Sequence, residues 1–179
     1  MEKLTAVGFA QLWKEAEQGN AQAQFMLAGA LYNGNGRQRD PIEGARWLLR
    51  AAEQGYAPAQ CDLGVMYLKG AGVKQDYGEA MKWLNKAAEQ DDALAQHSLG
   101  SVCAKGFRDK SVGLFNPMRY ALASATRDYV EAYKWFTLAA KNGHSQSLRD
   151  RALITKMWMK DYQIERAERL VREFENRGK

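Results

Sequence analysis

Few side chains in this chain of 179 residues could do chemistry beyond that of ordinary surface groups. It has two histidines, His97 and His144, and two cysteines, Cys61 and Cys103. Their spacings match no metal-ligand pattern, the Gly-x-Ser-x-Gly motif of serine hydrolases does not occur, and no acid/base pair of carboxylates stands out. We therefore predict no catalytic residue, no metal site and no cofactor, and we expect that the protein is not an enzyme.

The elements that must position these residues follow an internal repeat. The motif Ala-Glu-Gln-Gly occurs at 16–19 and again 36 residues later at 52–55, and variants of it occur at 88–91 and 140–143. A period of this size is typical of a solenoid, in which each repeat buries its apolar face against its neighbours. The expected repeats are residues 21–56, 57–92 and 93–144.

The first half of each repeat has the pattern of an amphipathic helix, here called helix A. Alanine, glutamine and leucine recur there at steps of three, which places them on one face. The aligned residues are Ala21, Gln24 and Leu27, then Ala57, Gln60 and Leu63, then Ala93, Gln96 and Leu99. A small residue follows (Ala28, Gly64 or Gly100), which we expect to let a neighbouring helix approach closely.

A turn and a second helix, helix B, complete each repeat. The turns Gly34-Asn35-Gly36 and Gly70-Ala71-Gly72 lack the third glycine and the preceding strand of a phosphate loop, so they indicate helix ends. Asp-x-x-Glu then begins at residues 40, 76 and 128. This spacing resembles a capping box and predicts that a helix starts at each of these aspartates. A tryptophan inside each helix B, at 47, 83 and 135, precedes an alanine pair by one turn.

Partial units are expected at both ends of a single domain that covers residues 1–179. Residues 1–20 contain an N-terminal capping helix, which we place from Phe9 to Asn20. Residues 145–179 contain two C-terminal capping helices. The first runs from Leu148 to Met159 with Leu148, Ala152, Leu153 and Met157 on one face, and the second is capped by Asp161. The last helix is basic and amphipathic, so a polar-faced cap is the favoured interpretation and a helix lying on a membrane is the alternative.

The third repeat departs from the template. Five residues separate Gly70 from Asp76, but twenty-one separate Gly106 from Asp128. The insertion, residues 107–127, mixes apolar side chains with four basic residues and one acidic residue. Insertions in solenoids often lie on the binding side, so we expect this segment to contact a partner. The alternative is a helical extension that packs on its own repeat.

Charge is unevenly distributed along the chain. The formal net charge is +5, to which residues 107–127 and 145–179 each contribute +3, while the remainder contributes −1. Two basic segments favour an acidic partner, and an ordinary soluble surface is the alternative. The basic residues form no repeating stripe, so we do not expect nucleic-acid binding.

The second repeat carries the fullest sequence pattern. Its residues are Ala57, Gln60, Leu63, Gly64, Tyr67, Gly70, Gly72, Val73, Asp76, Ala80, Trp83, Ala87, Ala88, Glu89 and Gln90. This pattern resembles the Sel-one-like repeat, a relative of the tetratricopeptide repeat, and the resemblance covers nearly all of residues 9–179. It implies an all-α fold, an α/α superhelix that is a right-handed solenoid of helix-turn-helix repeats.

The resemblance also implies a function. Members of this family are adaptors in bacteria that bind proteins or peptides and mostly catalyse nothing, so we expect a protein-interaction scaffold, in the form of an immunity protein or a regulatory adaptor. Some cysteine-rich members resemble penicillin-binding proteins in reported activity, and a hydrolase of that type is the alternative function. Those members have paired cysteines within each repeat, which this chain lacks.

By analogy with tetratricopeptide units, the inner face of helix A lines a binding groove. The residues that we predict to bind a partner are Phe25, Tyr32, Asn33, Val65, Leu68, Lys69, His97 and Lys105 in the groove, with Phe107, Arg108, Phe115 and Arg119 in the insertion. The apolar members could receive a helix or an extended peptide, and the lysines could pair with carboxylates. The alternatives are that the lysines are solvated and that Phe25 and Tyr32 pack beneath the N-terminal cap.

The compartment is expected to be the cytoplasm. Cys61 and Cys103 stand six repeat positions apart, about 9 Å along a helix, whereas a disulfide spans at most about 7 Å between Cα atoms. Free thiols favour a reducing compartment. The chain shows no signal peptide and no membrane-spanning run, although removal of a signal peptide would make a periplasmic or secreted location the alternative. The oligomeric state stays open.

Overall fold

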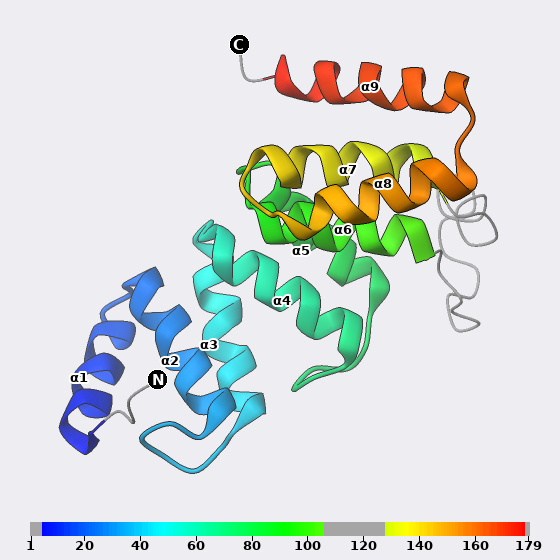
Figure 1. Ribbon diagram of the computed structural model, residues 1–179. Helices are drawn as coiled ribbons and strands as arrows, with labels where there is room; N and C mark the ends of the chain where they lie inside the picture. The colour runs from blue at the N-terminus through cyan, green and yellow to red at the C-terminus, as the bar shows by residue number, and fades with distance from the viewer. Residues whose placement is uncertain (1–4, 106–127, 178–179) are drawn as a thin grey trace. The chain divides into compact units, whose positions relative to one another are not determined.

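The computed structural model describes residues 5–105 and 128–177, and every regular element in these ranges is an α-helix. The helices are α1 (Ala6–Glu17), α2 (Ala21–Asn33), α3 (Pro41–Glu53), α4 (Ala57–Lys69), α5 (Tyr77–Ala88), α6 (Ala93–Lys105), α7 (Tyr129–Lys141), α8 (Gln146–Trp158) and α9 (Asp161–Glu175). They form two compact units, Met1–Asp92 with α1–α5 and Ala93–Lys179 with α6–α9 (Figure 1). Within the described ranges, no helix is long and apolar enough to cross a membrane. The predicted all-α fold of helical repeats is confirmed.

In the first unit, helices A and B of two repeats are the pairs α2–α3 and α4–α5, and α1 covers the outer side of the first pair. The core is built from the aligned leucines of helix A and the tryptophans of helix B, among them Leu27, Leu63, Trp47 and Trp83. Trp13 of α1 meets Trp47 edge to face, with ring centroids 5.6 Å apart. The tryptophan of α1 thus packs against the tryptophan of the first helix B.

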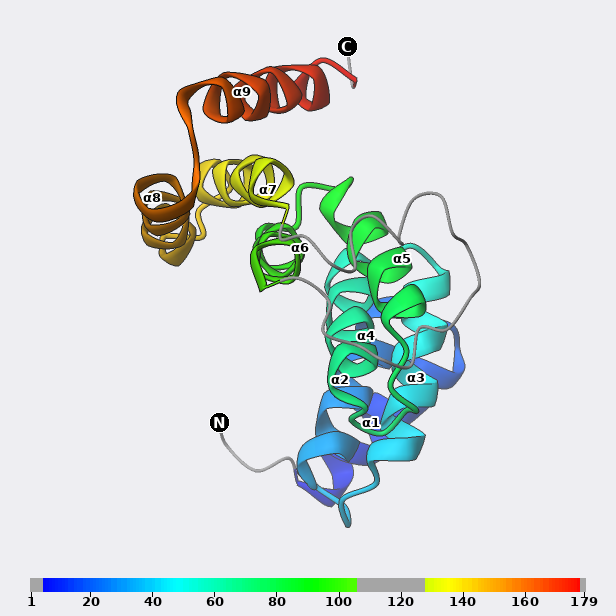
Figure 2. The same ribbon diagram turned by 90° about the vertical axis from the view of Figure 1, so that its right-hand side faces the viewer.

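In the second unit, α7 is the central helix and packs against α6, α8 and α9 (Figure 2). Its Val130, Tyr133 and Phe136 form a core with Ile154 of α8 and Ala167 of α9. The apolar stripe of α9 that the sequence predicts is turned toward this core, and Phe174 meets Trp135 at 5.4 Å. Its own unit therefore covers this stripe, which is the apolar face on which the membrane interpretation depends.

The three predicted starts of helix B are confirmed. The carboxylates of Asp40, Asp76 and Asp128 accept hydrogen bonds from the backbone N–H groups of Glu43, Glu79 and Glu131 at 2.9–3.0 Å. In a full capping box the glutamate side chain would also accept from the backbone N–H of the aspartate, and here that N–H has a different acceptor. The backbone N–H groups of the aspartates donate to carbonyls of helix A, namely those of Leu31, Tyr67 and Cys103, at 2.9–3.1 Å. Each cap thus also fastens helix B to helix A, and the third does so although 107–127 intervene.

Buried glutamines of helix A join the ends of successive helices. The Gln24 amide donates to the Ala16 carbonyl at the end of α1 and accepts from the Gln54 side chain at the end of α3. Gln60 repeats this arrangement one repeat later, donating to the Ala52 carbonyl of α3 at 3.0 Å and accepting from Gln90 at 2.8 Å. In the second unit, Gln96 accepts from Asn142 at 3.0 Å. The recurring Ala-Glu-Gln-Gly motif therefore supplies both a carbonyl and an amide to this network.

The ends of the chain depart from the expected boundaries. Helix α1 begins three residues before Phe9, because the Thr5 hydroxyl caps it by accepting from the Gly8 N–H at 3.1 Å. The N-cap of α9 is Lys160, whose N–H donates to the Gln163 side chain, so the prediction that Asp161 is the cap was wrong by one residue. The apolar residues that the sequence places together on α8 do not face the core, since Leu148, Leu153 and Met157 are at least half exposed. Ser147 and Ile154 are the buried residues of α8.

The small position of helix A allows close helix approach, as predicted. A Cβ added to Gly64 would lie 2.7 Å from Leu84 Cγ of α5, and one added to Gly100 would lie 2.6 Å from the Phe136 ring of α7. In the first repeat the small residue of helix A is Ala28, and Gly44 of helix B makes the space, since its added Cβ would lie 3.0 Å from the Ala28 carbonyl oxygen. Each helix pair thus has a glycine on one side of its contact.

We predict that Gly64→Ala lowers the free energy of unfolding relative to Gly29→Ala. Both glycines lie inside a helix A, where alanine gains about 1 kcal/mol of helix propensity. An added Cβ at Gly29 meets nothing within 4 Å, whereas that at Gly64 collides with Leu84. Overpacking of this kind costs about 1–3 kcal/mol, so urea denaturation should show Gly29→Ala neutral or stabilised and Gly64→Ala destabilised. Equal stability of the two variants would contradict the close contact between α4 and α5.

Candidate functional site

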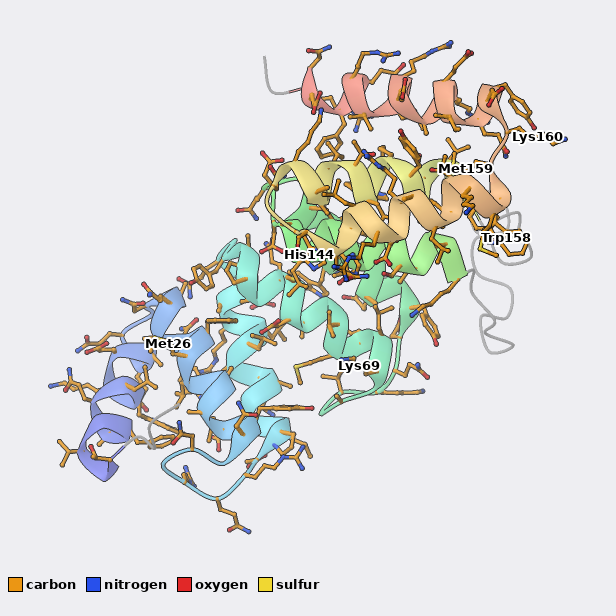
Figure 3. The ribbon with its side chains drawn as sticks, viewed as in Figure 1. Met26, Lys69, His144, Trp158, Met159 and Lys160 are labelled. Atoms are coloured by element: carbon orange, nitrogen blue, oxygen red, sulfur yellow. The ribbon has the colours of Figure 1, made fainter. Side chains whose placement is uncertain are left out.

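A groove of about 310 Å³ lies between α2 and α4 in the first unit. We call it the α2–α4 groove and define it by Phe25, Met26, Gly29, Tyr32 and Asn33 of α2, Gly44 and Leu48 of α3, and Asp62, Val65, Met66 and Lys69 of α4. Gly44 and Leu48 are buried and form its bottom. Figure 3 labels Met26 on α2 and Lys69 at the C-terminal end of α4.

Helical periodicity explains which side chains reach the groove. Asp62, Val65, Met66 and Lys69 stand at steps of three and four, so they form one stripe along α4. On α2, Phe25, Gly29 and Tyr32 form the facing stripe by the same rule. Gly29 has no side chain and an added Cβ there would meet nothing within 4 Å, so this position keeps the groove open.

Aromatic residues of the groove are held by contacts outside it. The Phe25 ring meets Tyr56 edge to face with centroids 5.4 Å apart and packs on the core. The Arg39 guanidinium lies 5.3 Å from the centroid of the Tyr32 ring, and Arg39 Nε donates to the Tyr32 carbonyl. Phe25 thus packs on the core beside Tyr56 and also lines the groove.

The charged residues of the groove are Asp62 and Lys69. The pKa of Asp62 is raised, first because neighbouring protein atoms remove water from the carboxyl group, and second because of the negative charge of Asp92. Lys69 acts in the opposite direction on the pKa of Asp62. Asp62 is nevertheless an exposed residue that lines the groove. The groove thus combines apolar walls with one acidic and one basic group.

The structure gathers five of the predicted partner-binding residues in this groove, namely Phe25, Tyr32, Asn33, Val65 and Lys69. Leu68 is half-buried on α4 and is not part of the lining. His97 and Lys105 lie on α6 in the second unit, where Lys105 is exposed. Phe107, Arg108, Phe115 and Arg119 lie outside the described residues.

Sequence reasoning missed Asp62, Met26 and Met66. The prediction left out the sixth position of helix A, which lines the groove from both α2 (Met26) and α4 (Asp62). It also left out the tenth position, which lines the groove from α4 (Met66). The i, i+3, i+4, i+7 spacing from Asp62 to Lys69 is visible in the sequence. Knowing that α2 and α4 face each other would have identified this stripe as a wall of the groove.

The second unit contains a polar cluster around Ser147. His97 of α6 and His144 of the α7–α8 turn stack with ring centroids 4.1 Å apart, and Figure 3 labels His144. The Nδ1 atoms of both rings lie 2.9–3.0 Å from the Oγ atom of the fully buried Ser147. The Asp150 carboxylate lies 3.7 Å from the same Nδ1 of His97. The sequence places both histidines correctly on or beside helices but gives no sign that they meet.

The contacts around His97 are not those of a tight Ser-His-Asp triad, in which the serine and the carboxylate bond to opposite nitrogens of the histidine. Ser147 and Asp150 approach the same nitrogen, Nδ1. Ser101 lies beside Nε2, but its Oγ is 3.4 Å away and Asp150 is 3.7 Å from Nδ1, both longer than the contacts of about 2.6–3.2 Å that activate a nucleophile. Among the described residues no group of three histidine, cysteine or acidic side chains could hold a metal ion. Burial raises the pKa of the Cys103 thiol to about 12 and also raises that of Cys61, which disfavours the reactive thiolate. The cluster therefore supports a structural role.

Comparison with models of known families shows to which family the chain belongs. The Sel1 repeat model matches residues 21–56, 57–92 and 120–144. The chain belongs to the Sel1 repeat family. Proteins with Sel1 repeats generally act as protein-interaction scaffolds without enzymatic activity. A search of the curated proteins returned no match.

Two solved Sel1 structures are similar to the chain, and both come from bacteria. One is c5321, a protective antigen present in uropathogenic Escherichia coli strains displaying an SLR fold, with 32% identity, a TM-score of 0.74 and coverage of 93% of this chain. The other is a Sel1 repeat protein from Oxalobacter formigenes, with 28% identity, a TM-score of 0.64 and coverage of 86%. The chain spans 32% and 62% of their respective lengths.

The polar cluster predicts a dependence of stability on pH. Burial and the nearby His144 lower the pKa of His97, with Lys105 acting in the same direction and Asp150 opposing it. Below about pH 6.5, His97 of the unfolded chain therefore binds a proton more readily than His97 of the folded protein. The contribution of neutral His97 to the free energy of unfolding is fully present above this pH. It is lost as the pH decreases through the folded pKa of His97, by at most about 1.4 kcal/mol per pH unit for one group.

We expect His97→Asn to reduce this loss of stability between pH 7 and pH 5. Asparagine does not titrate, and its amide can still bond to Ser147. The measurement is urea denaturation of both proteins across this range, followed by circular dichroism. The same slope of stability against pH in both proteins would show that His97 titrates normally.

Proposed function

We propose that this protein is a non-catalytic scaffold that binds a protein or peptide partner in the α2–α4 groove. The observation that supports this most strongly is that stripes of α2 and α4 form an open, largely apolar groove with one acidic and one basic group. Apolar clefts with a few polar groups are typical ligand sites. The general role of Sel1 repeats in protein interaction agrees with this use.

The insertion, residues 107–127, is a second proposed contact with the partner. It combines apolar residues with a formal charge of +3, which suits an acidic surface on a protein. An immunity protein that blocks a secreted toxin and a regulatory adaptor are two roles in which such a scaffold would serve. Deletion of 107–127 should weaken binding of a full-length partner if the insertion contributes.

We predict that Val65→Asp abolishes peptide binding in the groove. A random peptide display library selected on the wild-type protein supplies the probes. A charge placed on the apolar wall would have to be desolvated on binding, so the affinity for selected peptides should fall at least about tenfold, equivalent to about 1.4 kcal/mol. The readout is fluorescence anisotropy with labelled synthetic peptides.

The matched control for this experiment is Ile42→Asp. Ile42 is 60% exposed on α3 and does not line the groove, so this variant should bind the peptides within about twofold of wild type, a difference below 0.5 kcal/mol. Circular dichroism and thermal melting should show that both variants are folded. Equal affinities of the two variants for every selected peptide would refute binding in the α2–α4 groove.

A further inference from the structure

The wall of the groove on α4 has opposite charges at its two ends. Asp62 and Lys69 are seven residues apart on one helix face, which corresponds to about 10.5 Å along the axis. Val65 and Met66 lie between them and give the wall its apolar middle. The order along the wall is therefore acidic, apolar and basic.

Both charges remain available to a partner. Among the described residues, neither the Asp62 carboxylate nor the Lys69 ammonium has an ion-pair partner within 4.0 Å. Asp62 is partly desolvated and lies in the negative field of Asp92. A cation brought next to Asp62 would offset both effects, because a nearby opposite charge favours the ionised carboxylate.

The size of the groove restricts the shape of its occupant. Its volume of about 310 Å³ is at the small end of the range of ligand cavities, about 300–1,000 Å³. This volume cannot enclose the body of an α-helix, which is about 10–12 Å across with its side chains. One large apolar side chain from an extended segment fits the space above Leu48 and Gly44.

We propose that the groove binds an extended peptide segment with a basic, an apolar and an acidic residue at alternate positions. In an extended chain, alternate side chains point to the same side, and four residues span about 13 Å. The lysine or arginine of the segment pairs with Asp62, its leucine, methionine or phenylalanine lies against Val65 and Met66, and its aspartate or glutamate pairs with Lys69. Flexible charged side chains cover the difference of about 3 Å from the separation on α4. This assignment of the partner rests on the proposed function of the groove.

The first test is a double-mutant cycle between Asp62 and the peptide. Peptides selected on the wild-type protein from a random display library should carry a lysine or arginine two residues from an apolar residue. Asp62→Asn should weaken their binding about fivefold, the effect of a partly exposed ion pair of about 1 kcal/mol. Replacing the basic peptide residue by glutamine should weaken binding equally, and the two changes together should cost no more than either alone. Glu53→Gln is the control, since Glu53 is an exposed acid of α3 outside the groove.

The second test reverses the charge. Asp62→Lys should bind the selected peptide weakly, and exchange of the basic peptide residue for glutamate should restore binding. The effect of Asp62→Asn should shrink in 1 M NaCl, where the Debye length is about 3 Å. Selected peptides without a basic residue, an effect of Asp62→Asn no larger than that of Glu53→Gln, or tighter binding by Asp62→Asn would overturn the proposal. If Val65→Asp still abolishes binding in those cases, the groove is the site and only the charge pattern is wrong.

Discussion

The α2–α4 groove depends on the hydrogen bonds that the side-chain amide of a buried glutamine in each helix A makes with α3. Gln54, which caps the end of α3, donates to Gln24 of α2 at 2.7 Å, while the Ala52 carbonyl near the end of α3 accepts from Gln60 of α4 at 3.0 Å. Both walls of the groove are thus joined to the last turn of one helix. An amide buried without partners is costly, so each glutamine fixes the position of its helix as well as stabilising it.

This arrangement separates the residues that build the repeat from those available for binding. The glutamines, leucines and tryptophans face the core, and the caps Asp40 and Asp76 fasten helix B to helix A through their backbone N–H groups. On the groove stripe of α4, Met66 packs on this core, whereas Asp62, Val65 and Lys69 are not part of it. Asp62, Val65 and Lys69 occupy that stripe, which is consistent with selection of a partner by this surface.

Much of the fold follows from local sequence signals, whereas the sites depend on which helices meet. Asp40, Asp76 and Asp128 mark the starts of helix B because capping is a local interaction, and Gly64 and Gly100 mark close contacts because their spacing repeats. The stack of His97 on His144 joins residues 47 positions apart, and no local pattern predicts it. The outward direction of Leu148, Leu153 and Met157 on α8 is not indicated by the sequence, because α8 has no repeated counterpart among the helices of the three repeats. The same limitation hid Asp62, since its place in the groove depends on α2.

The most direct test of this account is the stability of Gln60→Leu relative to Gln22→Leu, measured by urea denaturation. Both glutamines belong to a helix A, but Gln60 is buried and joined to Ala52 and Gln90, while Gln22 is exposed. Leucine at 60 removes the side-chain donor of the Ala52 carbonyl, which keeps the Gly55 N–H, and also removes the acceptor of the Gln90 amide. The account therefore predicts a loss of about 1–3 kcal/mol for Gln60→Leu. Gln22→Leu should change stability by less than about 0.5 kcal/mol. Equal stability of the two variants would contradict the claim that the glutamine amides hold the walls of the groove in place.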